Sequence, residues 1–231
     1  MGRWGWRLFE GDQDLDIVCE LPESLSIQTG EWLHSLSQMV HQTDKLAPHE
    51  MREFYKPPEY LAELETEVVP WVRAKLNQDN LGDRLFAASR ARESNPSSLP
   101  PNEYKTIILG ALMMRAGAKI KSEDLQHLRD LVARINCNAR FALPIFDEGF
   151  RSPGRAQFLA ALDHYQEGVS RDFQEPSCFQ CGQVKGDVGH ALLKCGRCQD
   201  AWYCDNECQR RHWHEHKPSC IPRQRRLLLN V

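Results

Sequence analysis

The sequence predicts a mainly α-helical protein with a small finger at its C-terminal end. Before the cysteine-rich segment, apolar residues recur every three or four positions, as they do on one face of a helix. Seven of the nine cysteines then fall between Cys178 and Cys220, in pairs whose spacing is typical of zinc ligands. We therefore expect a helical domain over residues 1–172, a finger holding two zinc ions over 173–222, and a basic tail over 223–231.

The helical periodicity predicts one long apolar helix and several amphipathic ones around it. Residues 103–118 are apolar over most of their surface, which indicates a central core helix. Pro70 must kink the helix expected over residues 59–76 or begin a new helix there. Ser122 is expected to cap the helix over residues 122–135. Apolar and polar residues seldom alternate along the chain, so few strands are expected. The expected helices span residues 15–21, 29–40, 59–76, 81–94, 103–118, 122–135 and 154–168.

The composition excludes a membrane-spanning helix and argues against a disulfide framework. No run of eighteen apolar residues occurs, and the N-terminus lacks the apolar core of a signal peptide. We expect an intracellular protein, in the nucleus or the cytoplasm. Without a secretion signal, an odd number of cysteines favours metal binding over disulfides. Cys19 and Cys137 lie in apolar, helix-like surroundings and are expected to be buried thiols.

The cysteines after residue 177 follow a ligand pattern. They form two C-x2-C pairs, a C-x3-C pair and a final H-x3-C, and structural zinc takes four ligands in a tetrahedron. Seven cysteines and one histidine therefore complete two sites. Spacing alone leaves the pairing open, because the first four cysteines could form one ribbon-like site. The candidate ligands are Cys178, Cys181, Cys195, Cys198, Cys204, Cys208 and Cys220, with either His212 or His216.

The segment from Cys178 to Cys220 resembles the MYND-type zinc finger. The resemblance rests on the order of the ligand positions, on Trp202-Tyr203-Cys204 and on Trp213-x2-His216. It implies a cross-braced pair of sites and selects His216 rather than His212. One zinc would be held by Cys178, Cys181, Cys204 and Cys208, and the other by Cys195, Cys198, His216 and Cys220.

Both zinc ions are expected to be structural. Eight protein ligands for two ions leave no position open for a catalytic water. The HExxH motif is absent, since Trp213 follows His212. Nucleophile, phosphate-binding and dinucleotide motifs are also missing, as are the signature motifs of the lysine methyltransferases that contain some MYND-type fingers. We therefore expect that the chain is not an enzyme, and that zinc binding supplies the folding free energy of the short finger.

The resemblance also implies a protein partner. MYND-type fingers are protein-interaction modules, and some dock a short proline-containing motif in a shallow groove. Gln209 and Trp213 stand at the positions that line this surface, although Trp213 could equally pack inside the finger. An adaptor or regulator is the function expected.

Two alternatives stay open. One is a nuclear transcriptional regulator that contacts nucleic acid through the basic tail, and the other is an enzyme with an unrecognised site in the helical domain. Residues 178–231 carry nine Lys and Arg against five Asp and Glu. Seven thiolates and two zinc ions lower this excess to about +1, a weak footprint for phosphate binding, so nucleic acid is not expected as a partner.

The first residues resemble the opening of a domain family of unknown function, seen largely in bacteria, that begins M-G-x-W-G-x-x-x-F-x-x-D-x-x-x-D. This resemblance implies no activity. The whole chain is also similar to fungal proteins that pair such a helical domain with a C-terminal MYND finger. The matching residues are Gly2, Trp4, Gly5, Phe9, Asp12 and Asp16.

The acidic residues after this opening imitate a calcium-binding loop. The imitation fails at Ile17, where the loop requires glycine, so Asp12, Asp14 and Asp16 are expected to form the acidic first turn of a helix. The aromatic residues Trp4, Trp6 and Phe9 are expected to anchor the terminus to the helical core.

Overall fold

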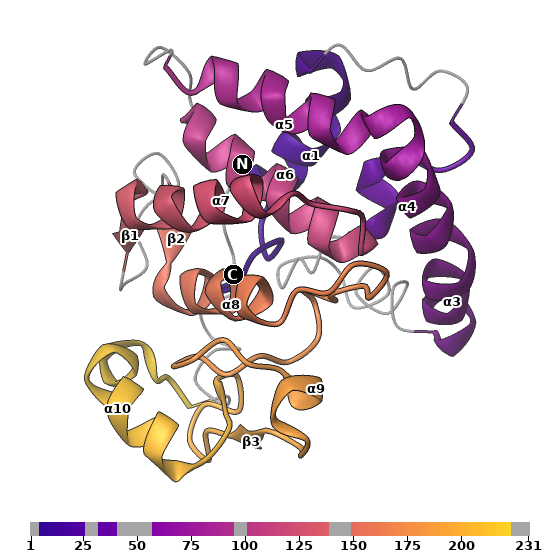
Figure 1. The fold of residues 1–231 in the computed structure, drawn as a ribbon. Helices are drawn as coiled ribbons and strands as arrows, with labels where there is room; N and C mark the ends of the chain where they lie inside the picture. The colour runs from indigo at the N-terminus through magenta and orange to yellow at the C-terminus, as the bar shows by residue number, and fades with distance from the viewer. Residues whose placement is uncertain (1–4, 26–31, 41–56, 95–100, 139–148, 223–231) are drawn as a thin grey trace.

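The computed structural model describes residues 5–25, 32–40, 57–94, 101–138 and 149–222. Figure 1 shows a larger helical part above a smaller finger that contains α9 and α10. Among the described residues, no helix is long and apolar enough to cross a membrane. The helices are α1 (Asp12–Ser24), α3 (Pro58–Glu63), α4 (Val69–Asn77), α5 (Leu81–Arg92), α6 (Asn102–Ala116), α7 (Ser122–Arg134), α8 (Ser152–Asp163), α9 (Lys185–Val188) and α10 (Asn206–His216), with short 3-10 or π turns η1 (Leu36–Met39), η2 (Leu64–Val68), η3 (Gln78–Asn80) and η5 (Lys217–Ser219).

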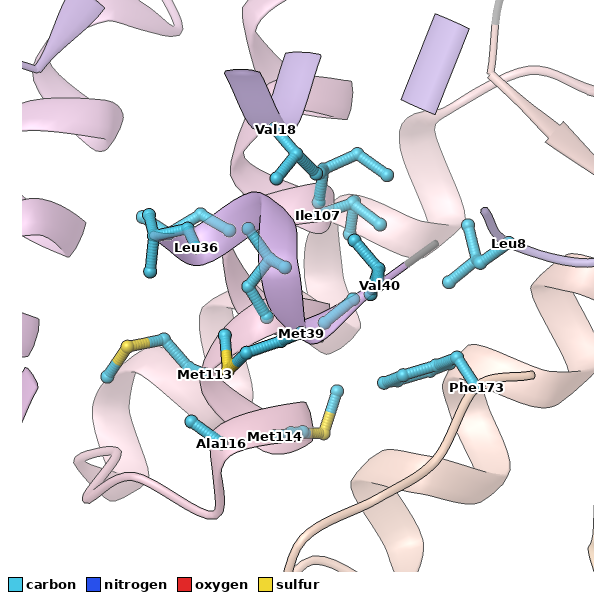
Figure 2. Close-up of a cluster of buried hydrophobic side chains, with 14 of the residues drawn as sticks. Leu8, Val18, Leu36, Met39, Val40, Ile107, Met113, Met114, Ala116 and Phe173 are labelled. Carbon is cyan, nitrogen blue, oxygen red and sulfur yellow. The ribbon is translucent and has the colours of Figure 1, made fainter. Parts of the chain in front are cut away.

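Helix α6 is the centre of the helical domain. Nearly every one of its side chains is buried, and α1, α4, α5, α7 and α8 all pack against it. Figure 2 shows Ile107, Met113 and Met114 of α6 meeting apolar side chains from η1 and from the two ends of the helical part, including Leu8 and Phe173. The prediction of an apolar central helix is confirmed. A helix that is apolar on all sides is buried completely only where other helices surround it.

Strands are few in the described part of the chain. The strands β1 (Cys137–Asn138) and β2 (Phe150–Arg151) pair in parallel beside α8. In the finger, β3 (Leu193–Lys194) pairs antiparallel with β4 (Trp202–Tyr203). The mainly helical class predicted from the periodicity is therefore confirmed.

The local predictions differ from the structure in several places. Within residues 32–40 the expected helix is only the 3-10 turn η1. A π-helical turn, η2, lies between α3 and α4, and Pro70 is the second residue of α4, so the helical stretch continues through the proline with a wider turn before it. Ser122 is the first residue of α7 and Lys121 occupies the cap position, while α8 ends at Asp163 rather than at residue 168.

An N-terminal turn, residues 5–11, joins the two parts of the molecule. The Glu10 carboxylate accepts the backbone N–H groups of Trp6 and Arg7 at 2.8 and 3.0 Å and pairs with the Arg7 guanidinium at 2.7 Å. Asp14, which is 1% exposed, accepts the N–H of Phe9 and the hydroxyl of Tyr104, both at 2.9 Å. Asp14 lies in the first turn of α1, as expected, and is in addition a buried acceptor that ties the N-terminal turn to α6.

The same turn contacts α8 and β2. The Leu8 N–H reaches the Gln157 side chain at 3.2 Å, and the Arg151 guanidinium donates to the Gly5 carbonyl and lies over the Trp6 ring. The expectation for Phe9 is confirmed, because its ring is buried in the helical core against Phe173.

Other expectations for single residues were wrong or cannot be checked. Trp6 packs against the apolar core of the finger rather than that of the helices. Cys19 is exposed and Cys137 is half-buried, so neither is the buried thiol expected. Trp4 and the basic tail lie outside the described residues.

The finger docks on α8 through its first C-x2-C turn. Gly182 has a positive φ of 78°, and a Cβ there would overlap the backbone carbonyl of Ala156 in α8. A side-chain contact fixes the segment that leads into the finger, since Gln157 of α8 donates to the Phe173 carbonyl at 2.7 Å. An ion pair completes the contact: Arg171 binds Asp187, the third residue of α9, through two hydrogen bonds of 2.7 Å.

Position 182 therefore requires glycine for two reasons: its positive φ and its close contact with the backbone of α8. Substitution should reveal both. We expect Gly182→Ala to lower the free energy of unfolding by about 3 kcal/mol or more, through backbone strain and through the clash with α8. Gly189→Ala is the matched control, because Gly189 has a φ of 75° but nothing within 4 Å of an added Cβ. Its cost should be about 1 kcal/mol. Urea unfolding of both variants measures the difference, and equal costs would show that the docking contact is not required.

The contact between the finger and the helical domain also holds a half-buried carboxyl group, that of Glu175. Burial, together with the nearby Asp172 and Asp187 carboxylates, raises its pKa from 4.5 to about 7. Because the folded protein binds this proton more tightly than the unfolded chain, the contribution of Glu175 to stability falls as the pH rises from 4.5 to about 7.

Glu175→Gln should therefore stabilise the protein above about pH 7, where the wild-type carboxylate is ionised, and bring no gain below pH 4.5. Chemical unfolding of the variant and the wild type across this window tests the prediction. A stability difference that does not vary with pH would contradict it.

Candidate metal centres

Four segments of the finger carry the cysteine and histidine side chains of the two candidate sites. The first C-x2-C turn closes with a hydrogen bond of 2.8 Å from the Gly182 N–H to the Cys178 carbonyl. The second turn leads from β3 toward β4, with the Cys195 N–H bonded to Ala201 at 2.9 Å. Cys204 directly follows β4, Cys208 and His216 lie on α10, and Cys220 directly follows the turn η5.

The first turn is fixed to the later segments by backbone pairing. The Phe179 N–H donates to the Trp202 carbonyl at 2.8 Å, which brings the turn beside β4 and hence beside Cys204. Helix α10 starts just afterwards, because the Asp205 side chain accepts the Cys208 N–H at 2.7 Å and caps the helix. Cys208 is thereby turned toward the first C-x2-C pair.

These contacts gather the eight residues into two groups. In each group, the ligand atoms all lie within 4.8 Å of one another. We call them the first site and the second site. The first site consists of Cys178, Cys181, Cys204 and Cys208, and the second of Cys195, Cys198, His216 and Cys220. The ribbon-like alternative, which would join the first four cysteines, is not the arrangement found.

Each group has the dimensions that a tetrahedral zinc ion requires. Zinc–sulfur bonds of about 2.3 Å place two sulfurs of a tetrahedron about 3.8 Å apart. The Cys181 and Cys204 sulfurs are 3.4 Å apart, and those of Cys195 and Cys220 are 3.7 Å apart. These separations are far longer than a disulfide bond of about 2.0 Å. Each group therefore fits one zinc ion, and the cross-braced pairing implied by the resemblance agrees with the structure.

The electrostatics of the thiols also favour a cation. A hydrogen bond from the Cys181 side chain lowers the pKa of Cys178 to about 5, whereas burial raises the pKa of Cys208 and of Cys220 to about 12. Thiols packed this closely cannot all lose their protons unless a positive charge lies among them. A zinc ion supplies that charge, and it binds each cysteine as a thiolate and the histidine as a neutral ring.

His212, the second histidine candidate, lies outside both groups. Its Nδ1 is 3.1 Å from the Tyr203 hydroxyl, and its ring stacks on that of His216 at 5.8 Å. Burial lowers its pKa to about 4, so the ring is neutral near pH 7. The His216 Nε2, in contrast, is 3.4 Å from the Cys198 sulfur. His212 is thus a buried packing residue that supports the ring of His216.

The two residues predicted to bind a partner lie on α10. Trp213 is 37% exposed and its ring contacts that of His216 at 6.0 Å. Gln209 is half-buried one helical turn earlier, on the same face of α10. Trp213 therefore both packs against the finger and presents its ring to solvent, while the role of the pair in binding stays a prediction.

The ligands of the two groups alternate in pairs along one short segment of the chain. This arrangement defines a cross-braced finger with two zinc ions. Residues 178–220 match the model of the MYND finger family, which identifies this segment as a MYND finger. MYND fingers are protein-interaction modules. No solved structure gives a match to the chain.

Several curated relatives share this segment of the chain. The chain is 38% identical over 84 residues to N-lysine methyltransferase SMYD2 of Bos taurus, and 34% identical over 87 residues to the human protein of the same name. N-lysine methyltransferase SMYD2-A of Danio rerio is 33% identical over 85 residues. Each match covers 32% of this chain and 19% of the relative, so the chain spans about a fifth of these proteins.

These relatives overturn the expectation that the chain is not an enzyme. The prediction relied on missing motifs and on the absence of an open zinc position, yet proteins named as methyltransferases contain the same finger. The reasoning failed because a structural zinc site only excludes chemistry at the zinc itself. It says nothing of chemistry that another part of the same chain performs.

The two buried histidines of α10 allow a direct test of the ligand assignment. We expect His216→Ala to bind one zinc ion per chain instead of two, as counted by native mass spectrometry after excess metal is removed. His212→Ala is the matched control, one turn away on the same helix. It should keep both ions and lose about 1 to 3 kcal/mol of stability, because the Tyr203 hydroxyl is left without its partner. Loss of zinc in His212→Ala alone would refute the assignment.

Proposed function

We propose that the eight residues hold two structural zinc ions and that the finger they form docks a short proline-containing peptide of a partner protein. The observation that carries the proposal is the Trp213 ring, exposed on α10 yet held by His216 of the second site. Aromatic side chains that are both rigid and accessible supply much of the energy at protein interfaces.

The position of α10 supports this use. The first C-x2-C turn packs on α8 through Gly182 and Ala156, and this face of the finger is thereby covered. In Figure 1, α10 lies at the lower left edge of the finger, apart from α8. Trp213 is 37% exposed in this docked arrangement, so its ring is accessible to a partner while the finger stays on α8.

The chemistry of α10 suggests how a peptide would be recognised. A proline ring can stack on the Trp213 indole, and the Gln209 amide can hydrogen-bond to the peptide backbone. The exposed side chains nearby include Arg210, Arg211 and Lys217. We therefore propose that the preferred motif carries acidic residues beside its proline.

Selection from a phage-displayed library of proline-containing peptides, with the full chain as bait, tests the proposal. Trp213→Ala should weaken the best peptide by about 30-fold or more, the loss of about 2 kcal/mol that defines a hot spot. Leu193→Ala is the matched control, because Leu193 is an exposed apolar residue on β3 and contributes to no ligand group. It should leave binding unchanged.

The zinc content of both variants is measured in parallel, so that loss of docking is separated from loss of the finger. Replacing the acidic residues of the selected peptide by lysine should weaken binding further. Peptide affinity that survives Trp213→Ala would contradict the proposal.

Lysine methyl transfer is a second candidate function, favoured by the names of the relatives. The full chain would be incubated with lysine-containing peptides and S-adenosylmethionine labelled in its methyl group. Label on the peptide lysines would support this activity, and its absence in the presence of both zinc ions would leave docking as the function of the finger.

A further inference from the structure

The side chain of Gln183 lies between the first site and the end of α8. Its amide oxygen is 3.5 Å from the Cys181 sulfur and 3.9 Å from the Cys204 sulfur. Its amide nitrogen is 3.4 Å from Nε2 of His164, which follows the last residue of α8. One glutamine thus touches two ligands of the finger and one residue of the helical domain.

The chemistry of the ligands determines how this amide must be turned when zinc is bound. A zinc-bound thiolate can only accept hydrogen bonds, so the end of the Gln183 amide beside Cys181 and Cys204 must be the NH₂ group. The carbonyl oxygen then faces His164, and Nε2 of that ring must carry its proton. The imidazole is therefore the donor that holds the amide in this orientation.

Charged groups lie beside His164. Its Nδ1 lies 3.8 Å from the Asp187 carboxylate, which binds Arg171 through two hydrogen bonds of 2.7 Å. Asp187 also accepts the Val184 N–H at 3.0 Å, and the Arg171 N–H donates to the Met114 carbonyl of α6 at 3.0 Å. The ring that orients Gln183 therefore lies beside the ion pair of Arg171 and Asp187, and Arg171 joins this pair to the central helix.

The two sites differ in their need for such support. All four residues of the second site are buried, whereas Cys181 and Cys208 of the first site are only half-buried. An accessible thiolate is open to protonation, which releases the metal, and an N–H donor directed at the sulfur lowers its basicity. Gln183 therefore supports the first site, which is the more accessible of the two.

We propose that Gln183 is a positioning residue of the first zinc site, and that His164 couples zinc retention at this site to the helical domain. The inference requires zinc in both groups and does not depend on peptide docking. Its failure would therefore leave the binding test of Trp213 unaffected.

The experiment measures zinc transfer from the full chain to a chromophoric chelator. Gln183→Met keeps the size of the side chain and removes the donor, and it should speed the release of one of the two ions by about 10- to 100-fold. His164→Ala should accelerate the same ion. His190→Ala is the matched control, since His190 is an exposed histidine of the finger whose Nδ1 lies 3.1 Å from the neighbouring Ala191 carbonyl and which belongs to neither ligand group.

Cobalt substitution identifies which site responds, because a four-sulfur site and a site with three sulfurs and one nitrogen have different absorption spectra. Loss of the donor should move the sulfur-to-cobalt charge-transfer band of the four-sulfur site to lower energy, since the thiolates become more electron-rich. A general loosening of the finger would change both sites together. If Gln183→Met does not fold, His164→Ala tests the same idea from outside the finger.

Equal acceleration of both ions would overturn the proposal, as would unchanged release in Gln183→Met. Release that responds to Gln183→Met but not to His164→Ala would overturn the coupling to the helical domain. Faster release of the four-sulfur site in both variants, with His190→Ala unchanged, is the expected result.

Discussion

The finger has too few apolar side chains to hold itself together, and its architecture follows from this shortage. Five of the nine residues buried in its core are cysteines of the two metal sites: the core consists of Cys178, Phe179, Leu192, Cys195, Cys198, Ala201, Tyr203, Cys204 and Cys220. Hydrophobic burial by so few side chains cannot offset the conformational entropy of ordering the segment. Metal coordination and docking on the helical domain must supply the rest.

The N-terminal turn makes that docking possible. Buried Glu10 and Asp14 satisfy backbone N–H groups of the turn, and Asp14 also joins it to Tyr104 of the central helix. From this fixed turn, Trp6 reaches the core of the finger and Arg7 donates to the Glu175 carbonyl at 2.5 Å. Residues far apart in the sequence thus form one junction, and the finger has a defined orientation on α8 rather than a flexible tether.

A docked finger has consequences for both metal retention and binding. The first site lies against α8 and gains a contact with the helical domain through Gln183. The second site supports α10, where His216 carries the exposed ring of Trp213. One half of the finger is thereby used for attachment within the molecule, and the other half presents a surface outward.

Much of the metal centre could be predicted from the sequence, because ligand type and spacing are local properties that zinc chemistry restricts strongly. The same holds for α6, whose apolar surface allows only a central position. Spacing could not choose between His212 and His216, since both lie on one face of α10, and the family resemblance made that choice. The buried role of Asp14, the contact of Trp6 with the finger and the position of Gln183 beside His164 were decided only by the tertiary structure. They depend on which segments meet in space, and neither periodicity nor spacing along the chain records that.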